Sequence, residues 1–255
     1  MSDTKKVIML GNEAIARGAY EAGVKVSSAY PGTPSTEISE NLVQYKEDLY
    51  AEWAPNEKVA AETAIGASIS GVRAMACMKH VGLNVASDPL YTVSYMGVNG
   101  GLLFMVADDP GLYSSQNEQD TRMIARAAKV PVLEPSDSEE AKEFVKIGFE
   151  LSEQYDRPVI FRITTRLAHS QGLVELKERI EIPDKPYEKN IRKNVMMPGN
   201  AKYRHVEIEK RNRELKAAAE TLAINRVELR DLKIGVITSG IPYQYVRERC
   251  QKHPF

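Results

Sequence analysis

The chain has 255 residues and a mass of 28.5 kDa, which is enough for one large α/β domain or for one domain with an appendage. Its 34 lysines and arginines nearly balance its 35 aspartates and glutamates, so no overall basic field argues for nucleic-acid binding. The only two cysteines, Cys77 and Cys250, exclude a disulfide framework, a four-thiolate zinc site and a cysteine-ligated iron–sulfur cluster within this sequence.

The N-terminus and the apolar runs favour a cytoplasmic protein with no membrane partner. Val7–Leu10 is too short for a signal peptide, because the polar residues Asn12 and Glu13 soon interrupt the apolar run. The longest apolar run, Leu102–Ala107, is too short to span a bilayer. The low cysteine content is typical of a reducing cytosol.

Short apolar, β-branched runs alternate with helical patterns through the first part of the chain. This alternation is typical of an α/β fold in which a mostly parallel sheet carries helices on both faces. The sequence predicts strands at Lys6–Leu10, Val24–Ala29, Leu49–Trp53, Val72–Met78, Leu102–Ala107, Val130–Leu133 and Pro158–Ile163. Between them it predicts helices that include Glu13–Ala22, Ser35–Gln44, Glu57–Ser70 and Ser138–Glu153, the first and third stopped by Gly23 and Gly71.

A charged region follows this alternating part. Residues 175–233 hold 26 of the 69 charged residues, with prolines in the first half and a predicted helix over Val206–Ala223. Lys233–Gly240 then predicts a strand and a glycine turn, with a first helical turn at Tyr243–Arg249. A single βα unit cannot bury its own apolar face, so this end is interpreted as part of a truncated or split domain.

Three parts are therefore predicted along the chain. Residues 1–172 form a ligand-binding α/β domain, residues 173–231 a charged and partly helical connector, and residues 232–255 the incomplete start of a second α/β domain. Ligands of open parallel sheets bind beyond the carboxyl ends of the strands, so the loops at those ends are the candidate binding segments.

The first two candidate loops each have a functional and a structural interpretation. Ser28–Thr36 carries the hydroxyl groups of Thr33 and Ser35 beside a helix N-terminus, which suits an anion, or else it is a rigid turn with Ser35 as the N-cap. Trp53–Glu57 precedes a helix rich in small residues. Its Glu57 is either a poorly solvated functional carboxyl group or a carboxylate that stabilises the helix N-terminus.

The third and fourth loops follow the two most apolar strands. Cys77–Asn84 places Lys79 and His80 at the carboxyl end of a strand, where two titratable groups favour function as much as structure. Asp108–Asp120 is either a solvated connection or a specificity loop over the site.

Several strings together resemble the N-terminal, pyrimidine-binding domain of the 2-oxoacid:ferredoxin oxidoreductases. Within that family, the chain is similar to alpha subunits that act on indolepyruvate. The matching strings occur in the family's order and are Gly11–Gly18, Tyr30–Ser35, Asn56–Glu57, Ala64–Ser68, Lys79–Asn84 and Ser114–Asp120, and the similarity continues into Ile234–Gly240.

The resemblance implies a thiamine diphosphate enzyme that oxidatively decarboxylates aryl 2-oxoacids such as indolepyruvate, with acyl-CoA and reduced ferredoxin as products. It gives Glu57 the catalytic role, as the carboxyl group that hydrogen-bonds N1′ of the cofactor's aminopyrimidine. Further cofactor contacts are implied at Pro31 and Gly82. The implied substrate pocket is bordered by Thr33, Lys79, His80, Gln116 and Asn117.

The sequence also departs from the family pattern. It has Asp108–Asp109 where related pyruvate enzymes carry a substrate-binding arginine, and it has neither a Gly-Asp-Gly motif for Mg²⁺ and the diphosphate nor CxxC runs for iron–sulfur clusters. We therefore expect the chain to be inactive alone. The expected partner is a polypeptide that carries the diphosphate-binding and ferredoxin-like modules, together with Mg²⁺ and the clusters, in an oligomeric assembly that uses coenzyme A and ferredoxin.

Two alternatives remain beside this interpretation. In the first alternative, the chain is a non-catalytic, truncated relative that binds a partner or helps assembly. In the second, it is an oxidoreductase of the same family that acts on another 2-oxoacid. A Rossmann-type nucleotide enzyme is disfavoured, because no G-x-G-x-x-G follows the first strand.

Overall fold

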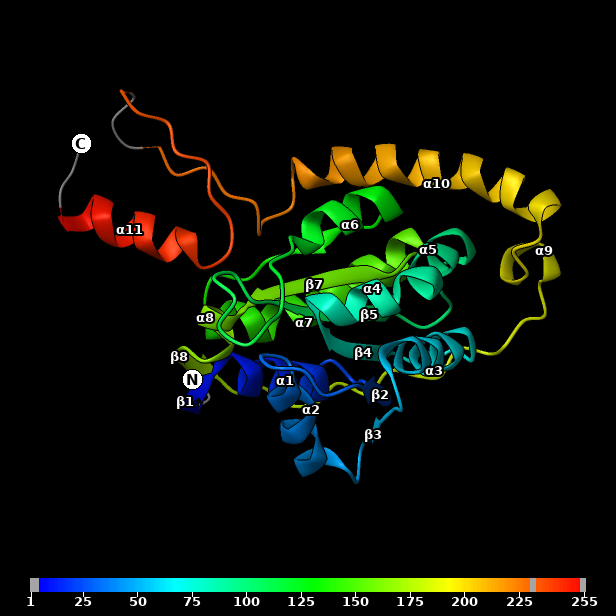
Figure 1. The fold of residues 1–255 in the computed structure, drawn as a ribbon, viewed down its shortest axis with the longest axis horizontal. Helices are drawn as coiled ribbons and strands as arrows, with labels where there is room; N and C mark the ends of the chain where they lie inside the picture. Colours follow the sequence, from blue (N-terminus) through cyan, green and yellow to red (C-terminus); the bar gives the residue numbers. More distant parts are fainter. Residues whose placement is uncertain (1–4, 230–232, 253–255) are drawn as a thin grey trace.

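The structure, a computed structural model, describes residues 5–229 and 233–252. Its centre is a six-stranded parallel sheet in the order β3–β2–β4–β5–β7–β6 (Figure 1). The prediction of an α/β fold with a mostly parallel sheet is confirmed. The strands of this sheet are β2 (Val26–Ala29), β3 (Tyr50–Trp53), β4 (Ala74–Lys79), β5 (Leu102–Asp108), β6 (Val132–Leu133) and β7 (Val159–Thr164).

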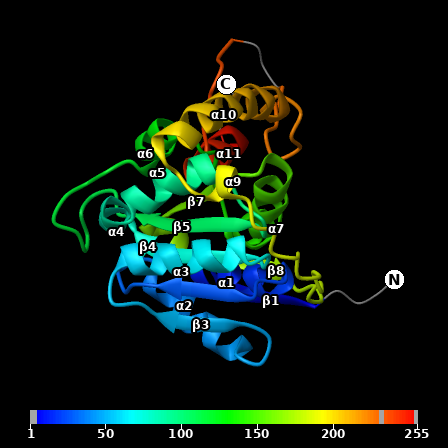
Figure 2. The ribbon, with the colours of Figure 1, turned by 90° about the vertical axis from the view of Figure 1, so that its right-hand side faces the viewer.

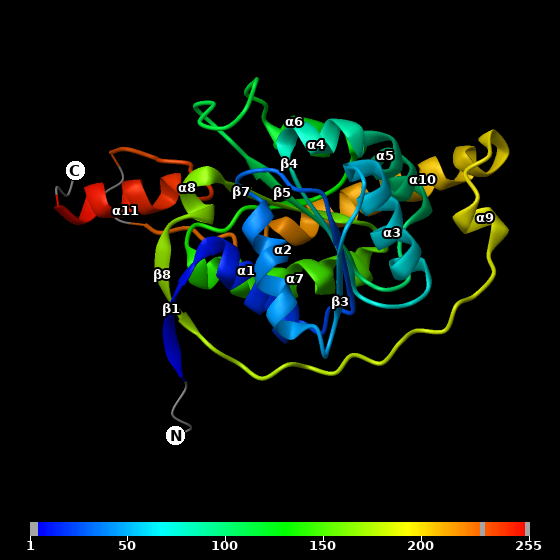
Figure 3. The ribbon, with the colours of Figure 1, turned by 60° about the horizontal axis from the view of Figure 1, so that its bottom comes forward.

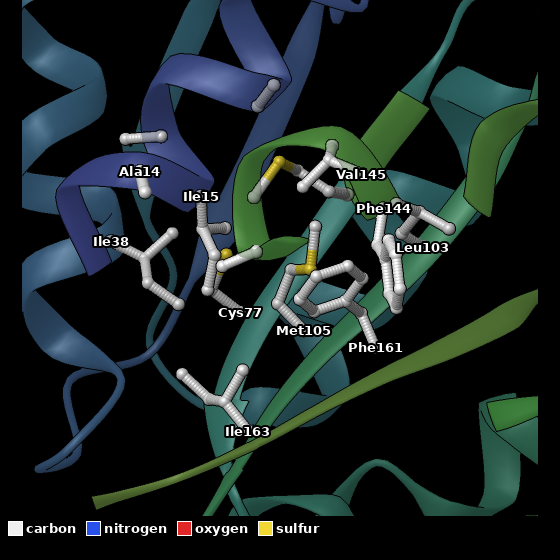
Figure 4. Packing of buried hydrophobic residues seen from close by; sticks show 14 of the residues in the cluster. Ala14, Ile15, Ile38, Cys77, Leu103, Met105, Phe144, Val145, Phe161 and Ile163 are labelled. Atoms are coloured by element: carbon white, nitrogen blue, oxygen red, sulfur yellow. The ribbon is translucent and has the colours of Figure 1, made fainter. Parts of the chain in front are cut away.

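Helices cover both faces of the sheet, because alternate side chains of each buried strand point to opposite sides. In β4, Met75 and Cys77 belong to one apolar cluster, whereas Ala76 and Met78 belong to the other. The first cluster packs against α1, α2 and α7 (Figure 4), and the second against α3, α4, α5 and α6. The bounds are α1 (Gly11–Glu21), α2 (Thr36–Leu42), α3 (Glu57–Ile69), α4 (His80–Val85), α5 (Ser87–Met96), α6 (Thr121–Ala128) and α7 (Ser138–Tyr155), with a 3₁₀ turn, η1 (Val43–Tyr45), after α2.

Two glycines end helices where the sequence predicts it. Gly23 follows α1 with φ of +73°, and Gly71 follows α3 with φ of +108°. These are left-handed backbone conformations, which a side chain with a Cβ atom rarely adopts. Each glycine therefore lets the chain leave its helix and turn back towards the sheet.

The first strand does not join the main sheet, which corrects the expectation that it begins the parallel series. β1 (Lys6–Leu10) pairs antiparallel with β8 (Gln171–Glu175), an additional strand that crosses the proposed domain end at residue 172. β1 is only half-buried, and Ile8 is 70% exposed, unlike the fully buried strands β4 and β5. The short helix α8 (Thr165–Ala168) brings β8 back from β7 to this position.

Two expectations for the C-terminal part are also corrected. Residues 233–240 form no strand, because no strand of the described residues forms a backbone ladder with them, and Ile237 is fully exposed. The connector helix begins earlier than predicted, since Pro198 does not break α10 (Pro198–Ala219) but starts it, in the first turn, where its missing N–H costs nothing. The other two helices are α9 (Ile191–Asn194) and α11 (Pro242–Lys252), and within the described ranges none is both long and apolar enough to cross a membrane.

The charged connector runs along the surface of the domain (Figure 3) and is bound to it by ion pairs. Residues 176–190 run as extended chain along the outside of the domain from β8 to α9 (Figure 3). The Asp156 carboxylate, in the turn after α7, then forms ion pairs with Lys193 at 2.8 Å, with Arg204 at 3.5 Å and with Arg211. One carboxylate thus holds three cations of the α9–α10 region against the domain.

Candidate functional site

The site predicted from the sequence lies where the strand order of the sheet reverses. From β2 the chain passes to β3 on one side, and then crosses to β4 on the other side of β2. The helix that follows β2, α2, packs in the apolar cluster on one face, and the helix that follows β4, α4, packs in the cluster on the opposite face, so the chain leaves the neighbouring strands β2 and β4 towards opposite faces. In open α/β sheets, such a divergence leaves a crevice at the carboxyl ends of the strands. This crevice is the candidate site.

The turn after β2 forms one wall and is held by its own hydrogen bonds. Ser35 Oγ donates to the Gly32 carbonyl at 2.7 Å, and the Gly32 amide donates to Thr36 Oγ1 at 2.9 Å. Ser35 occupies the N-cap position of α2 but makes no side-chain cap bond, so it stabilises the turn instead. Thr33 and Pro31 are exposed at the tip of this turn.

Glu57 is the first residue of α3 and lies half-buried at the N-terminus of that helix. The preceding Asn56 caps the helix, because its Oδ1 accepts from the Val59 amide at 3.0 Å. In the part of the chain that the structure describes, no hydrogen bond or ion pair reaches the Glu57 carboxylate. Trp53 and Pro55 are themselves exposed. The group packed against the carboxylate is Gly82 of α4, where an added Cβ would lie 2.6 Å from Glu57 Oε1.

Lys79 and His80 are buried at the junction of β4 and α4. Lys79 packs its methylene groups against Gly32 and donates from Nζ to the Ser114 carbonyl at 2.8 Å. His80 Nε2 lies 3.0 Å from the Asn117 carbonyl, which only accepts, so Nε2 carries the proton. His80 Nδ1 is buried and has no hydrogen-bond partner among the described residues. Both side chains thus connect the third candidate loop to the fourth.

The paired aspartates at the end of β5 are structural anchors. Asp108 accepts from Thr121 and pairs with Arg162 at 2.7 Å, which holds the far end of the fourth loop. Asp109 accepts from the Ser114 amide at 2.7 Å and from two hydroxyl groups. Burial opposes ionisation of Asp109, but these hydrogen bonds outweigh that effect and lower its pKa. Both carboxylates therefore already have hydrogen-bond or ion-pair partners within the domain.

The fourth loop brings only its backbone to the crevice. Gln116 and Asn117 have exposed side chains, and Figure 2 shows the segment between β5 and α6 extending outward past α4. Among the predicted site residues and their neighbours, contacts therefore join Gly32 with Lys79, Glu57 with Gly82, and His80 with the Asn117 carbonyl. Within the described chain, no hydrogen bond or ion pair joins the Gln116 side chain to them.

Asn12 is a supporting residue that the sequence analysis did not single out. It is 1% exposed, and its Nδ2 donates to the Pro34 carbonyl at 2.8 Å and to Glu37 at 3.1 Å. The available signal was an amide side chain in the first turn of a helix whose other buried residues, apart from Glu21, are glycine, alanine and isoleucine. Asn12 fixes the turn that carries Thr33.

A cavity of about 770 Å³ lies at the same edge of the sheet but beyond β7. Tyr113, Arg162, Arg166 and Tyr245 are among its lining residues, and none of the predicted site residues is. Across residues 5–229 and 233–252, no group of three histidine, cysteine or carboxylate side chains is arranged to hold a metal ion.

Comparison with known proteins gives one family and a set of longer relatives. The family model for the pyruvate flavodoxin/ferredoxin oxidoreductase thiamine diphosphate-binding domain matches residues 17–226. The indolepyruvate oxidoreductase subunit IorA of Archaeoglobus fulgidus is 46% identical over 98% of this chain and 41% of its own length. That of Pyrococcus horikoshii is 48% identical over 96% of this chain and 39% of its own. The chain thus spans about 40% of the length of these relatives.

Two more distant matches, one in sequence and one in structure, are also to proteins named for a 2-oxoacid substrate. The 2-oxoglutarate synthase subunit KorA of Methanothermobacter thermautotrophicus is 31% identical over 71% of this chain and 49% of its own length. A solved 2-oxoglutarate:ferredoxin oxidoreductase from Magnetococcus marinus, with 2-oxoglutarate, coenzyme A and succinyl-CoA bound, superposes with a TM-score of 0.76. It covers 99% of this chain and 52% of its own, and at 18% identity it supports the fold alone.

Proposed function

Because this chain belongs to the pyruvate flavodoxin/ferredoxin oxidoreductase family with a thiamine diphosphate-binding domain, we propose that it forms the pyrimidine-binding half of a thiamine diphosphate site. The reaction is oxidative decarboxylation of an aryl 2-oxoacid such as indolepyruvate, with acyl-CoA and reduced ferredoxin as products. The indolepyruvate oxidoreductase relatives support this substrate class. The observation that carries the proposal is the Glu57 carboxylate, half-buried and unpaired within the described chain, at the reversal of the strand order.

The residues around Glu57 suit an aminopyrimidine. The ring nitrogen N1′ needs one hydrogen-bonding carboxyl group, and Glu57 has no competing partner in the described chain. Gly82 adds no side chain beside that carboxyl group, and its helix α4 is one wall of the crevice. When bound, thiamine diphosphate supplies the carbon nucleophile and electron sink of the decarboxylation. Glu57 then exchanges a proton with N1′, and Pro31 and Gly82 border the ring.

Lys79 and Thr33 are the proposed contacts of the substrate carboxylate. The Lys79 ammonium group has three donors, and the Ser114 carbonyl takes one of them. Its burial between Gly32 and the fourth loop places a positive charge in a poorly solvated position, where attraction to an anion is stronger than in water. Thr33, exposed on the adjacent turn, adds a hydroxyl donor, and His80 borders the same pocket together with the backbone of the loop that carries Gln116 and Asn117.

A partner polypeptide is proposed to complete the site. It is proposed to carry Mg²⁺ with the diphosphate-binding module, the iron–sulfur clusters and the contact with ferredoxin; the given 255 residues contain neither a Gly-Asp-Gly motif nor CxxC runs. The assembly is oligomeric and cytoplasmic, and it takes coenzyme A as the acyl acceptor.

The test is to purify the tagged chain from its own host and to analyse the material for partner polypeptides, thiamine diphosphate and cluster absorbance. Glu57→Gln is expected to abolish reduction of a redox dye by indolepyruvate and coenzyme A. Glu62→Gln, on the exposed side of the same helix, is the matched control and retains activity. Full activity of Glu57→Gln would refute the role of Glu57. A preference for 2-oxoglutarate in the same assay would instead favour another 2-oxoacid as substrate.

A further inference from the structure

Gly82 lies inside α4 although neither helix propensity nor backbone conformation calls for glycine there. Glycine is a poor helix former, and among ordinary residues only proline is worse. The described glycines with a positive φ do not include Gly82, so its backbone is open to any residue. A different reason must therefore explain the absence of a side chain at this position.

The reason is the space occupied by Glu57. A Cβ atom on Gly82 would lie 2.6 Å from both Cγ and Oε1 of Glu57 and 2.9 Å from Cδ, closer than real Cβ contacts come. At Gly11 and Gly100, by contrast, the first atom met would be a backbone carbonyl oxygen, of Leu167 and Val72. Those glycines allow backbones to pack, whereas Gly82 makes room for one carboxylate side chain.

The backbone of Glu57 is already fixed by its place in the helix. Asn56 caps α3, and Glu57 is the first helical residue, so only side-chain rotation remains to set the position of the carboxyl group. Gly82 permits the rotamer in which that side chain lies along α4. An alanine would exclude this rotamer. Because the atoms met belong to the far end of a flexible side chain, the carboxyl group would move while the fold stays intact.

We propose that Gly82 is a positioning residue that sets the location of the Glu57 carboxyl group in the candidate site. The inference rests on the proposed function of Glu57 towards the aminopyrimidine. A displacement of about 1 Å at a reacting group costs on the order of 100-fold in rate, so the effect should be measurable without loss of the protein.

The experiment uses the complex purified with its partner and compares Gly82→Ala with Gly66→Ala. Gly66 is in α3, and an added Cβ there meets nothing within 4 Å. The readouts are the melting temperature and the rate of hydrogen–deuterium exchange at C2 of bound thiamine diphosphate, measured by NMR after acid quench. Gly82→Ala is expected to keep the wild-type melting temperature and to exchange roughly 100-fold more slowly. Gly66→Ala is expected to match wild type in both.

A double-mutant cycle shows whether Gly82 acts through Glu57. Glu57→Ala has no side chain to displace, so adding Gly82→Ala to it should leave the exchange rate unchanged. This double variant also avoids the steric clash, so it assembles even if Gly82→Ala alone does not. The proposal is overturned if Gly82→Ala exchanges at the wild-type rate, or if it slows exchange equally in the Glu57→Ala background. A wild-type complex that binds no thiamine diphosphate, or in which Glu57→Ala exchanges normally, would instead overturn the proposed function itself.

Discussion

Lys79 donates from Nζ to the Ser114 carbonyl at 2.8 Å, so the last residue of β4 holds the loop that follows β5. The next residue, His80, makes a second tie to the same loop at the Asn117 carbonyl. Both residues are proposed substrate contacts, and both already have a structural task. Their variants should therefore change loop mobility as well as substrate binding.

Replacement of Lys79 by methionine tests both tasks at once. The variant keeps the apolar stem against Gly32 but loses the hydrogen bond and the positive charge. We expect faster amide hydrogen exchange across residues 111–117 and a roughly tenfold to hundredfold increase in KM for the 2-oxoacid in the assembled enzyme, or about 1.4–2.8 kcal/mol. Lys58→Met, at an exposed lysine paired with Asp88, is the control. An unchanged KM would remove Lys79 from the substrate site.

Asp109 should make the stability of the domain depend on acid pH. Its pKa is lowered in the folded state, so its stabilising contribution is present above its unfolded pKa, about 3.9, and is lost as the pH falls through the lower folded value. Asp109→Asn should lose about 2 kcal/mol of unfolding free energy at pH 7, because hydrogen bonds to a charged acceptor are lost. Urea unfolding from pH 7 to pH 3 measures this. The variant's curve should be flatter below pH 4, and parallel curves would contradict the assignment.

The Asp156 carboxylate should control the docking of the connector. Asp156→Ala removes the carboxylate that Lys193, Arg204 and Arg211 share and leaves these partly buried cations with hydrogen bonds to backbone carbonyls only. We expect about 2 kcal/mol of lost stability and rapid limited proteolysis within residues 190–219. Glu214→Ala breaks only an exposed i,i+4 pair with Lys210 and should change neither measurement. Wild-type protease resistance in Asp156→Ala would show that apolar contacts such as Ile208 suffice.

The two cysteines should differ in reactivity. Cys77 is 1% exposed within β4, and burial raises the pKa of its thiol to about 12, so almost no thiolate exists at neutral pH. Cys250, on α11, is only half-buried, so reagents reach it more easily than they reach Cys77. Iodoacetamide at pH 8 should alkylate Cys250 and spare Cys77 in the native protein, as read by mass spectrometry of peptides. In urea both should react, and native labelling of Cys77 would show that the sheet opens.

The central strands β4 and β5 were predictable because they are buried on both sides. β4 and β5 are fully buried and therefore appear in the sequence as continuous apolar runs bounded by glycine or charged residues. The pairing of β1 with β8 was not predictable in this way. The two strands are separated by the whole domain in sequence, and their partly exposed residues carry no signal of which strand they meet.

The same distinction applies to the candidate site. Local sequence determined that Thr33, Glu57, Lys79 and His80 each lie at or just after the carboxyl end of a strand, because strand ends and helix starts are set by neighbouring residues. Only the tertiary structure decided that Gly82 lies against Glu57, that Gly32 lies against Lys79, and that Asp108 and Asp109 anchor a loop instead of meeting a ligand. These relationships join residues that are far apart in the chain, and their distances depend on how the sheet and its helices pack together.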